Sequence, residues 1–107
     1  MDNQEVYDKV KAHLLSQNRK SLELGGGCAY RGMDGAMCAV GVLIPDDMYS
    51  RSMEGSECGV GEVRDVLANL GINGAFARGL QQIHDGVYLS NWNNELKRFA
   101  VIHGLKP

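Results

Sequence analysis

A run of small and apolar residues from Cys28 to Ile44 limits the folds open to this chain most, because a turn sequence interrupts two stretches that suit β-strands. The turn, Met33-Asp34-Gly35, fits a three-residue loop that ends in a glycine at positive φ. Loops of this kind join neighbouring antiparallel strands. The segment therefore predicts a β-hairpin.

The length of the loop sets which residues of the hairpin pair. With three loop residues, Tyr30 lies opposite Cys38. One face then collects apolar residues suited to a core: Cys28, Tyr30, Cys38, Val40, Val42 and Ile44. On the other face, Ala39 and Gly41 are small enough to let another part of the chain approach closely. A two-residue loop, Asp34-Gly35, would shift the pairing by one residue and place the cysteines on opposite faces.

Helical patterns lie on both sides of the predicted hairpin. Asp2 and Glu5 form a capping box, and the apolar residues after them recur at helical spacing, which predicts a helix over residues 3–16. Three shorter helices follow from the same spacing and from capping and stop residues: Glu62 to Leu70, Asn73 to about Gly86, and Ser90 or Asn91 to Gly104. The prediction is one α+β domain over residues 1–107, with a β-hairpin or small antiparallel sheet packed by about four helices.

The overall charge and hydropathy narrow the classes of partner. The chain has 107 residues, a net charge of −2 and a pI near 5.8, so it has no general attraction to nucleic acid or to an anionic membrane. No apolar stretch approaches the roughly 18 residues of a membrane span, and the N-terminus lacks the core of a signal peptide. We therefore expect a cytoplasmic protein that binds no membrane and whose three cysteines are free thiols.

The sequence also resembles a known group of proteins. The pattern combines Cys28-x-Tyr30-Arg31-Gly32-x-Asp34-Gly35-x-x-Cys38-Ala39-Val40-Gly41-x-Leu43-Ile44-x-Asp46-x-x-Tyr49 with Glu54-Gly55, Leu80-Gln81-x-x-His84-Asp85 and Trp92. It is similar to small proteins encoded by tailed bacteriophages and prophages, and the similarity covers most of the chain. Met33 stands where we expect proline before Asp-Gly, a difference that leaves the turn intact. The resemblance implies a phage origin and a bacterial host cytoplasm, and it implies no catalytic residue and no cofactor.

A metal site is one chemistry to consider. Zinc prefers the ligand atoms of cysteine and histidine, which this chain offers at Cys28, Cys38, Cys58, His84 and His103. Zinc sites usually contain pairs of such residues two to four positions apart, and the sequence has no C-x-x-C or H-x-x-x-H pair. We therefore predict no metal, and interpret Cys28 and Cys38 as small core residues.

A cysteine-dependent hydrolase is one alternative function. It would use Cys38 or Cys58 as nucleophile, His84 as base and Asp85 to orient the imidazole. The two last residues are neighbours near a predicted helix end, where Asp85 would more naturally cap the helix or bind backbone. This placement argues against the enzyme, so we predict a protein without catalytic residues.

A helix-turn-helix regulator is a second alternative. The helix from Glu62 to Leu70, the break at Gly71 and the helix that reaches His84 have the expected order. Its second helix carries Arg78 as its one basic residue, although affinity for DNA depends on contacts to phosphates. The pattern argues against nucleic acid as a partner.

The remaining interpretation is a small non-enzymatic accessory protein that binds a host or phage protein, for example as an inhibitor of a host enzyme or defence complex. Its candidate contacts are aromatic, methionine and acidic residues in predicted loops: Asp46, Asp47, Met48, Tyr49, Glu54 and Tyr88. The acidic residues between positions 45 and 65 would also suit a patch that binds a basic surface. The sequence predicts no oligomeric state.

Overall fold

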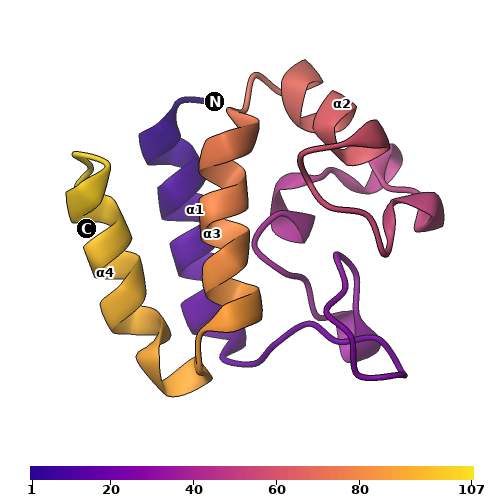
Figure 1. Cartoon of the computed structure of the whole chain (residues 1–107), viewed down its shortest axis with the longest axis horizontal. Coiled ribbons are helices and arrows are strands. Elements are labelled where there is room, and N and C mark those ends of the chain that lie inside the picture. The colour runs from indigo at the N-terminus through magenta and orange to yellow at the C-terminus, as the bar shows by residue number, and fades with distance from the viewer.

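The chain folds into helices and turns without a β-sheet. The computed structural model describes all residues from 1 to 107, and its regular elements are four α-helices and five short 3-10 helices (Figure 1). The β-type pairings are two isolated bridges, Leu22 with Cys28 and Arg31 with Met37. The predicted α+β class, with its β-hairpin or small antiparallel sheet, is therefore wrong, and the protein is all-helical.

The four α-helices follow the predicted pattern closely. α1 (Asn3–Gln17) begins after Asp2, and the predicted capping box with Glu5 is confirmed. The other three are α2 (Gly61–Asn69), α3 (Gly74–Gly86) and α4 (Trp92–Ile102). Asn73 caps α3 as predicted, because its side-chain oxygen accepts a hydrogen bond from the Phe76 N–H at 3.0 Å.

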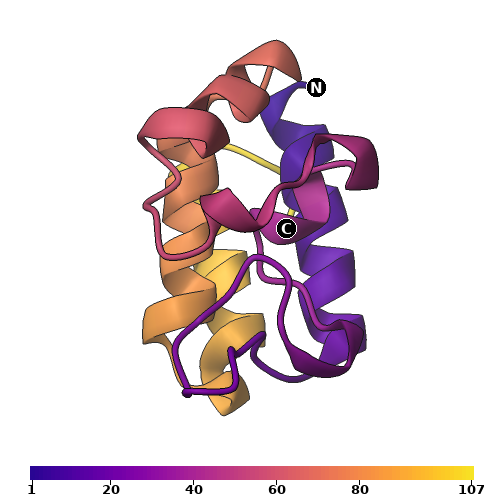
Figure 2. The same ribbon diagram turned by 90° about the vertical axis from the view of Figure 1, so that its right-hand side faces the viewer.

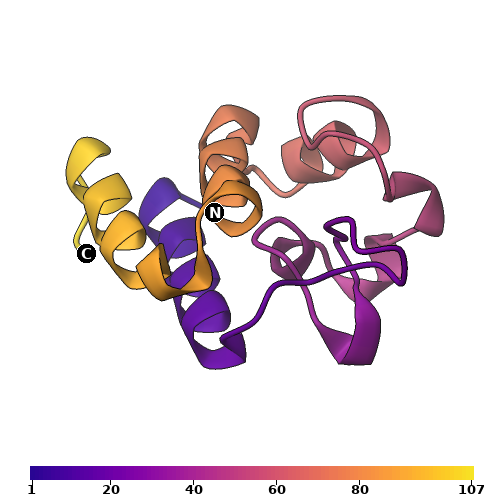
Figure 3. The same cartoon turned by 60° about the horizontal axis from the view of Figure 1, so that its bottom comes forward.

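The helices and the loops occupy separate parts of the molecule. α1, α3 and α4 lie side by side in a helical layer, and residues 18–60 form a loop lobe beside it, with α2 across one end of the lobe (Figures 1 and 3). Viewed from the lobe, the loops cover α1 and α3 while α4 lies behind them (Figure 2). None of the helices is both long and apolar enough to cross a membrane.

The core fills the space among the helices and beneath the loop lobe. Its largest fully buried side chains are Trp92, Tyr7, Leu14, Ile44, Leu67, Leu80 and Leu96. α3 and α4 approach closely at Gly79, where a Cβ atom would lie 2.8 Å from the ring of Phe99. Both parts of the molecule contribute apolar side chains to this core, so its burial joins the lobe to the helical layer.

A turn forms at the predicted position, although no hairpin extends from it. Met33–Gly35 is a short 3-10 helix (η1) in which Asp34 and Gly35 have φ values of 57° and 76°. The predicted positive φ of Gly35 is therefore confirmed. The bridge between Arg31 and Met37 also has the register expected for a three-residue loop, but it is the one pairing that this turn makes.

Side chains take the backbone hydrogen bonds that the first predicted strand would need. The N–H groups of Tyr30 and Arg31 both donate to the carboxylate of Glu54, at 2.9 and 3.1 Å. In the predicted pairing the Tyr30 N–H would have donated to the Cys38 carbonyl instead, while the Arg31 N–H would have pointed away from that strand. Because Glu54 satisfies both, the ladder stops after a single bridge.

The second predicted strand is also held by side chains. Met37 N–H donates to Gln17 Oε1, and Val40 N–H donates to Gln81 Oε1, both at 2.9 Å. The chain then turns into a 3-10 helix, η2, at Gly41–Leu43. In the predicted hairpin the Val40 N–H would have donated to the opposite strand, so Gln81 of α3 replaces that contact, while Gln17 of α1 binds the N–H on the outer side of the segment.

Gly41 and the remaining turns complete the lobe. A Cβ atom at Gly41 would clash with the backbone carbonyl of Tyr30, so the predicted close approach at this position is confirmed. Three further 3-10 helices are η3 (Asp46–Met48), η4 (Arg51–Met53) and η5 (Leu89–Asn91). The first of them is a single helical turn that begins directly after Pro45.

Candidate functional site

Three polar residues on one face of α3 join the helical layer to the loop lobe: Gln81, His84 and Asp85. Their spacing of i, i+3 and i+4 places them on the same helix face. Gln81 accepts a hydrogen bond from Val40 in the lobe, and its amide nitrogen donates to Asp85 Oδ1 at 2.8 Å. We call these three residues the α3 clamp.

His84 is fully buried, and both of its ring nitrogens are hydrogen-bonded. Nε2 lies 2.9 Å from the backbone nitrogen of Ser21, and Nδ1 lies 2.7 Å from Asp85 Oδ1. A backbone N–H can only donate, so Nε2 must be the unprotonated nitrogen, and Nδ1 carries the proton that Asp85 accepts. Neutral His84 thereby binds α3 to residues 18–28, which we call the connector.

Asp85 is the charged member of the clamp. Burial raises the pKa of Asp85, but hydrogen bonds from His84 and Gln81 lower it by more, so the pKa lies below its usual value. The Cys28 sulfur is close, since the ligand atoms of Cys28, His84 and Asp85 all lie within 4.8 Å of one another. Burial, followed by the nearby carboxylate, raises the pKa of the Cys28 thiol and keeps it protonated at neutral pH.

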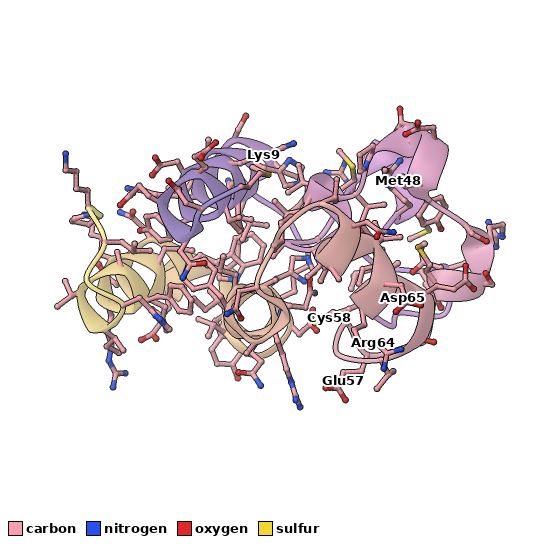
Figure 4. All side chains as sticks on the ribbon, turned by 90° about the horizontal axis from the view of Figure 1, so that it is seen from above. Lys9, Met48, Glu57, Cys58, Arg64 and Asp65 are labelled. Atoms are coloured by element: carbon pink, nitrogen blue, oxygen red, sulfur yellow. The ribbon has the colours of Figure 1, made fainter.

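A cavity of about 400 Å³ lies beside the clamp, between α3 and the loop lobe. All three cysteines line this cavity, together with Tyr30, Arg78 and Asp85. Figure 4 shows Cys58 where the lobe meets α3. The wall also contains an ion pair between Arg78 and Glu57 at 2.8 Å. The cavity therefore combines protonated thiols with charged groups that already have partners.

The residues of the hydrolase alternative do not assemble into a catalytic site. Cys38 is buried, and its sulfur accepts a hydrogen bond from Gly41 N–H at 3.3 Å. Burial raises the pKa of Cys38 to about 12, so its thiolate is scarce at neutral pH. No hydrogen bond joins His84 to Cys38 or Cys58, and the nitrogen that would act as base accepts from Ser21 instead. Neither Cys38 nor Cys58 is therefore paired with His84 as a nucleophile with its base.

We expect the purified protein to retain far less than about one zinc ion per chain. The candidate ligands are Cys28, His84 and Asp85. Zinc at Nδ1 of His84 would require the proton to move to Nε2, which faces the Ser21 N–H donor at 2.9 Å. Elemental analysis after dialysis measures the retained metal. A content near one zinc per chain that is lost in Cys28→Ser would contradict this prediction.

A second concave surface, the groove, lies on the loop lobe. Its volume is about 390 Å³, and its lining includes Leu24, Arg31, Met33, Tyr49, Arg51 and Glu54. The guanidinium carbon of Arg31 lies 4.8 Å from the centroid of the Tyr49 ring, a cation–π contact. The groove therefore gathers apolar, aromatic and arginine side chains at one place.

Most of the predicted contact residues lie on or beside the groove. Tyr49 and Glu54 line it, and Asp46 pairs with the groove residue Arg31 at 2.7 Å. Asp47 and Met48 follow in η3 and are exposed. Three of the six residues that the sequence singled out are therefore connected to the groove, two as lining residues and one through its ion pair.

Two of these residues have other positions or roles than predicted. The carboxylate of Glu54 accepts from Tyr30, Arg31 and Tyr49, so it organises the lobe and is not free for a partner. Tyr88 does not line the groove, because it lies in the connection between α3 and α4, with 81% of its surface exposed.

The acidic residues between positions 45 and 65 do not form one patch. They are divided among separate partners: Asp46 with Arg31, Glu57 with Arg78 and Asp65 with Arg64. Figure 4 shows Met48 and Glu57 at opposite edges of the lobe. A single acidic surface for a basic partner is therefore not present.

α2 and α3 also lack the surface that a DNA-binding helix pair requires. α3 packs most of its apolar and polar residues inward, among them Phe76, Leu80, Gln81 and His84. Its exposed Arg78 is paired with Glu57. No unpaired basic residue of α3 is left to contact phosphate.

Comparisons with family models, with curated proteins and with solved structures find no significant match. Sequence reasoning missed the roles of Ser21 and Leu24. The exposed position of Leu24 could have been predicted, since a large apolar residue directly before three glycines is suited to the tip of an exposed turn.

Proposed function

We propose that this protein acts by binding a segment of another protein in the groove of the loop lobe, without catalysing a reaction. The observation that carries the proposal is Leu24 at the rim of the groove, with 91% of its surface exposed. A single exposed leucine is ordinary, but this one shares a concave surface with Met33 and Tyr49. A partner that covers these side chains gains the free energy of removing them from water.

The turn that carries Leu24 is ordered before any partner arrives. Glu23 N–H donates to the Gly27 carbonyl at 2.7 Å, and Gly26 N–H donates to the Glu23 carbonyl at 2.8 Å. The bridge between Leu22 and Cys28 closes the base of the turn. Because the turn is already ordered, little conformational entropy is lost when Leu24 is covered.

Other parts of the groove are ordered too. Arg31 is held by Asp46 and by the Ile44 carbonyl, both at 2.7 Å. Tyr49 donates its hydroxyl proton to Glu54 at 2.5 Å. Arg51 makes no ion pair and is free to bind a polar group of the partner. Tyrosine and arginine are among the side chains that are enriched at the energetic centres of protein interfaces.

The resemblance to phage-encoded proteins guides the choice of partner. It makes a protein of the bacterial host, or a second phage protein, the class that we propose. Inhibition of a host enzyme or defence complex would be one result of occupying such a partner.

The test compares two variants that each place a carboxylate at an exposed aliphatic position. Leu24→Asp changes the groove, whereas Val101→Asp changes α4, where the side chain is 71% exposed. Tagged wild-type protein and both variants are used to capture proteins from bacterial lysate, and quantitative mass spectrometry compares them. We expect one partner that wild type and Val101→Asp retain and that Leu24→Asp loses by about tenfold or more.

Circular dichroism of both variants checks that they are folded. Capture profiles that do not differ between Leu24→Asp and Val101→Asp would contradict the groove as the binding site.

A further inference from the structure

The hydrogen bond between Ser21 and His84 fixes the connector to α3 at a buried position. Ser21 and His84 are both fully inaccessible to solvent. Two other contacts from the connector to α3 are exposed: Lys20 Nζ donates to the Asp85 carbonyl at 3.3 Å, and the Cys28 thiol donates to the Asp85 carboxylate. The Ser21 bond is thus the buried polar attachment of the connector to this helix.

This bond exists only while His84 is neutral. A protonated imidazole carries hydrogen on both nitrogens, so Nε2 would then present an N–H to the N–H of Ser21 at 2.9 Å. Two donors cannot bond to each other, and the buried Ser21 N–H would be left without an acceptor. We propose that His84 is an acid-operated latch: its neutral ring holds the connector against α3, and its protonation releases the connector.

The surroundings of His84 contain few charges. From α3 it faces the Asp85 carboxylate at 2.7 Å, which stabilises a charged imidazolium. From the connector it is approached by the protonated Cys28 thiol, and Lys20 binds the backbone next to it. From the side of α4 it meets the uncharged ring of Trp92 at a centroid distance of 5.4 Å. No ion pair joins it to α1.

Protonation of the other two histidines would not break a hydrogen bond in this way. His13 Nε2 lies 2.8 Å from the Met37 carbonyl, to which an imidazolium donates as well as a neutral ring does. His103 stacks on Phe99 beyond the end of α4, at a centroid distance of 4.1 Å. Only His84 uses a ring nitrogen to accept a backbone N–H.

Release of the connector would change the groove. The turn that carries Leu24 is part of the connector, and it forms one rim of the groove. Loss of partner binding in acid would therefore follow, a consequence that rests on the proposed function. Movement of the connector itself does not rest on it, so the experiment measures the connector directly.

Amide hydrogen exchange followed by NMR tests the latch in the full chain. Protection factors, which correct for the intrinsic effect of pH on exchange, are compared at about pH 7.5 and about pH 5, a range in which histidine charge changes. We expect the protection of Ser21 to fall by about tenfold or more in acid while Val10 in α1 and Leu96 in α4 stay protected. The variant His84→Gln, a neutral acceptor at both pH values, should show no such change.

Imidazole nitrogen shifts of the wild-type protein, recorded in the same samples, report when His84 becomes protonated. They keep the test valid if His84→Gln does not fold. Loss of Ser21 protection that follows His84 protonation supports the latch. Three results would overturn it: Ser21 stays protected while His84 is protonated, His84 stays neutral at about pH 5, or the helical core loses protection together with Ser21. Partner capture by Leu24→Asp is measured near pH 7.5, so either proposal can fail alone.

Discussion

Replacing Trp92 by alanine is expected to lower the free energy of unfolding by about 3–5 kcal/mol, the cost typical of truncating a large buried aromatic side chain. Trp92 is 1% exposed, at the start of α4. Its indole N–H donates to the Val87 carbonyl at 3.1 Å, and its ring packs beside that of His84. Alanine would leave a cavity next to the α3 clamp and remove the donor for Val87.

Urea denaturation followed by far-UV circular dichroism measures this loss. Fluorescence is unsuitable, because Trp92 is the single tryptophan of the chain. Trp92→Phe serves as the control, since it keeps a ring in the site and should cost about half as much. A loss below about 1 kcal/mol for Trp92→Ala would show that the site is less tightly packed than the structure indicates.

Gly41→Ala is the second change with a large expected effect, a loss of about 3 kcal/mol. The added Cβ would clash with the Tyr30 carbonyl. A flexible side chain could rotate away, but this neighbour is backbone, and Glu54 holds it through the N–H of Tyr30. The segments around residues 30 and 41 must therefore move apart, and η2 lies against α1 in the core.

Gly74→Ala is the matched control for this substitution. No atom lies within 4 Å of the Cβ position at Gly74, and alanine suits the first turn of α3 better than glycine does. We expect it to change stability by no more than about 0.5 kcal/mol. Equal melting temperatures for Gly41→Ala and wild type would rule out the close backbone approach.

The helices could be predicted from sequence because their signals are local. The capping box of Asp2 and Glu5 and the cap at Asn73 lie within a few residues of the helices that they begin. The glycine at position 71 likewise follows Leu70, the C-cap of α2, and has a φ of 71°. Such patterns are complete in a short stretch of chain, so they do not depend on the rest of the fold.

The prediction of a hairpin was wrong because the residues that prevent the hairpin lie far from it in the sequence. The turn at residues 33–35 and the Arg31–Met37 register were both predictable from local sequence. The acceptors that end the ladder, however, come from Glu54 and Gln81. No local pattern shows that a glutamine in one helix will bind an amide twenty or more residues away.

The sequence predicted which residue types would occur at the candidate site, but it did not predict which groups they contact. His84 and Asp85 do interact, as a histidine and a carboxylate in a catalytic group would. The third partner is the backbone N–H of Ser21 and not a thiol, which changes a possible base into a structural acceptor. Contact residues such as Tyr49 could be predicted because aromatic residues in loops are suited to interfaces.

The dependence of the loop lobe on side chains of the helices also has a consequence for the order of folding. Residues 18–60 contain two isolated bridges and short 3-10 turns, and the acceptors for Ser21, Met37 and Val40 come from α1 and α3. These acceptors are in position only after the helices have packed, and contacts between distant residues form late because the entropy of loop closure is lost before those contacts stabilise the chain. A helical layer assembled around Trp92 would therefore form first, with the lobe still disordered, and a peptide of residues 18–60 alone would remain unfolded.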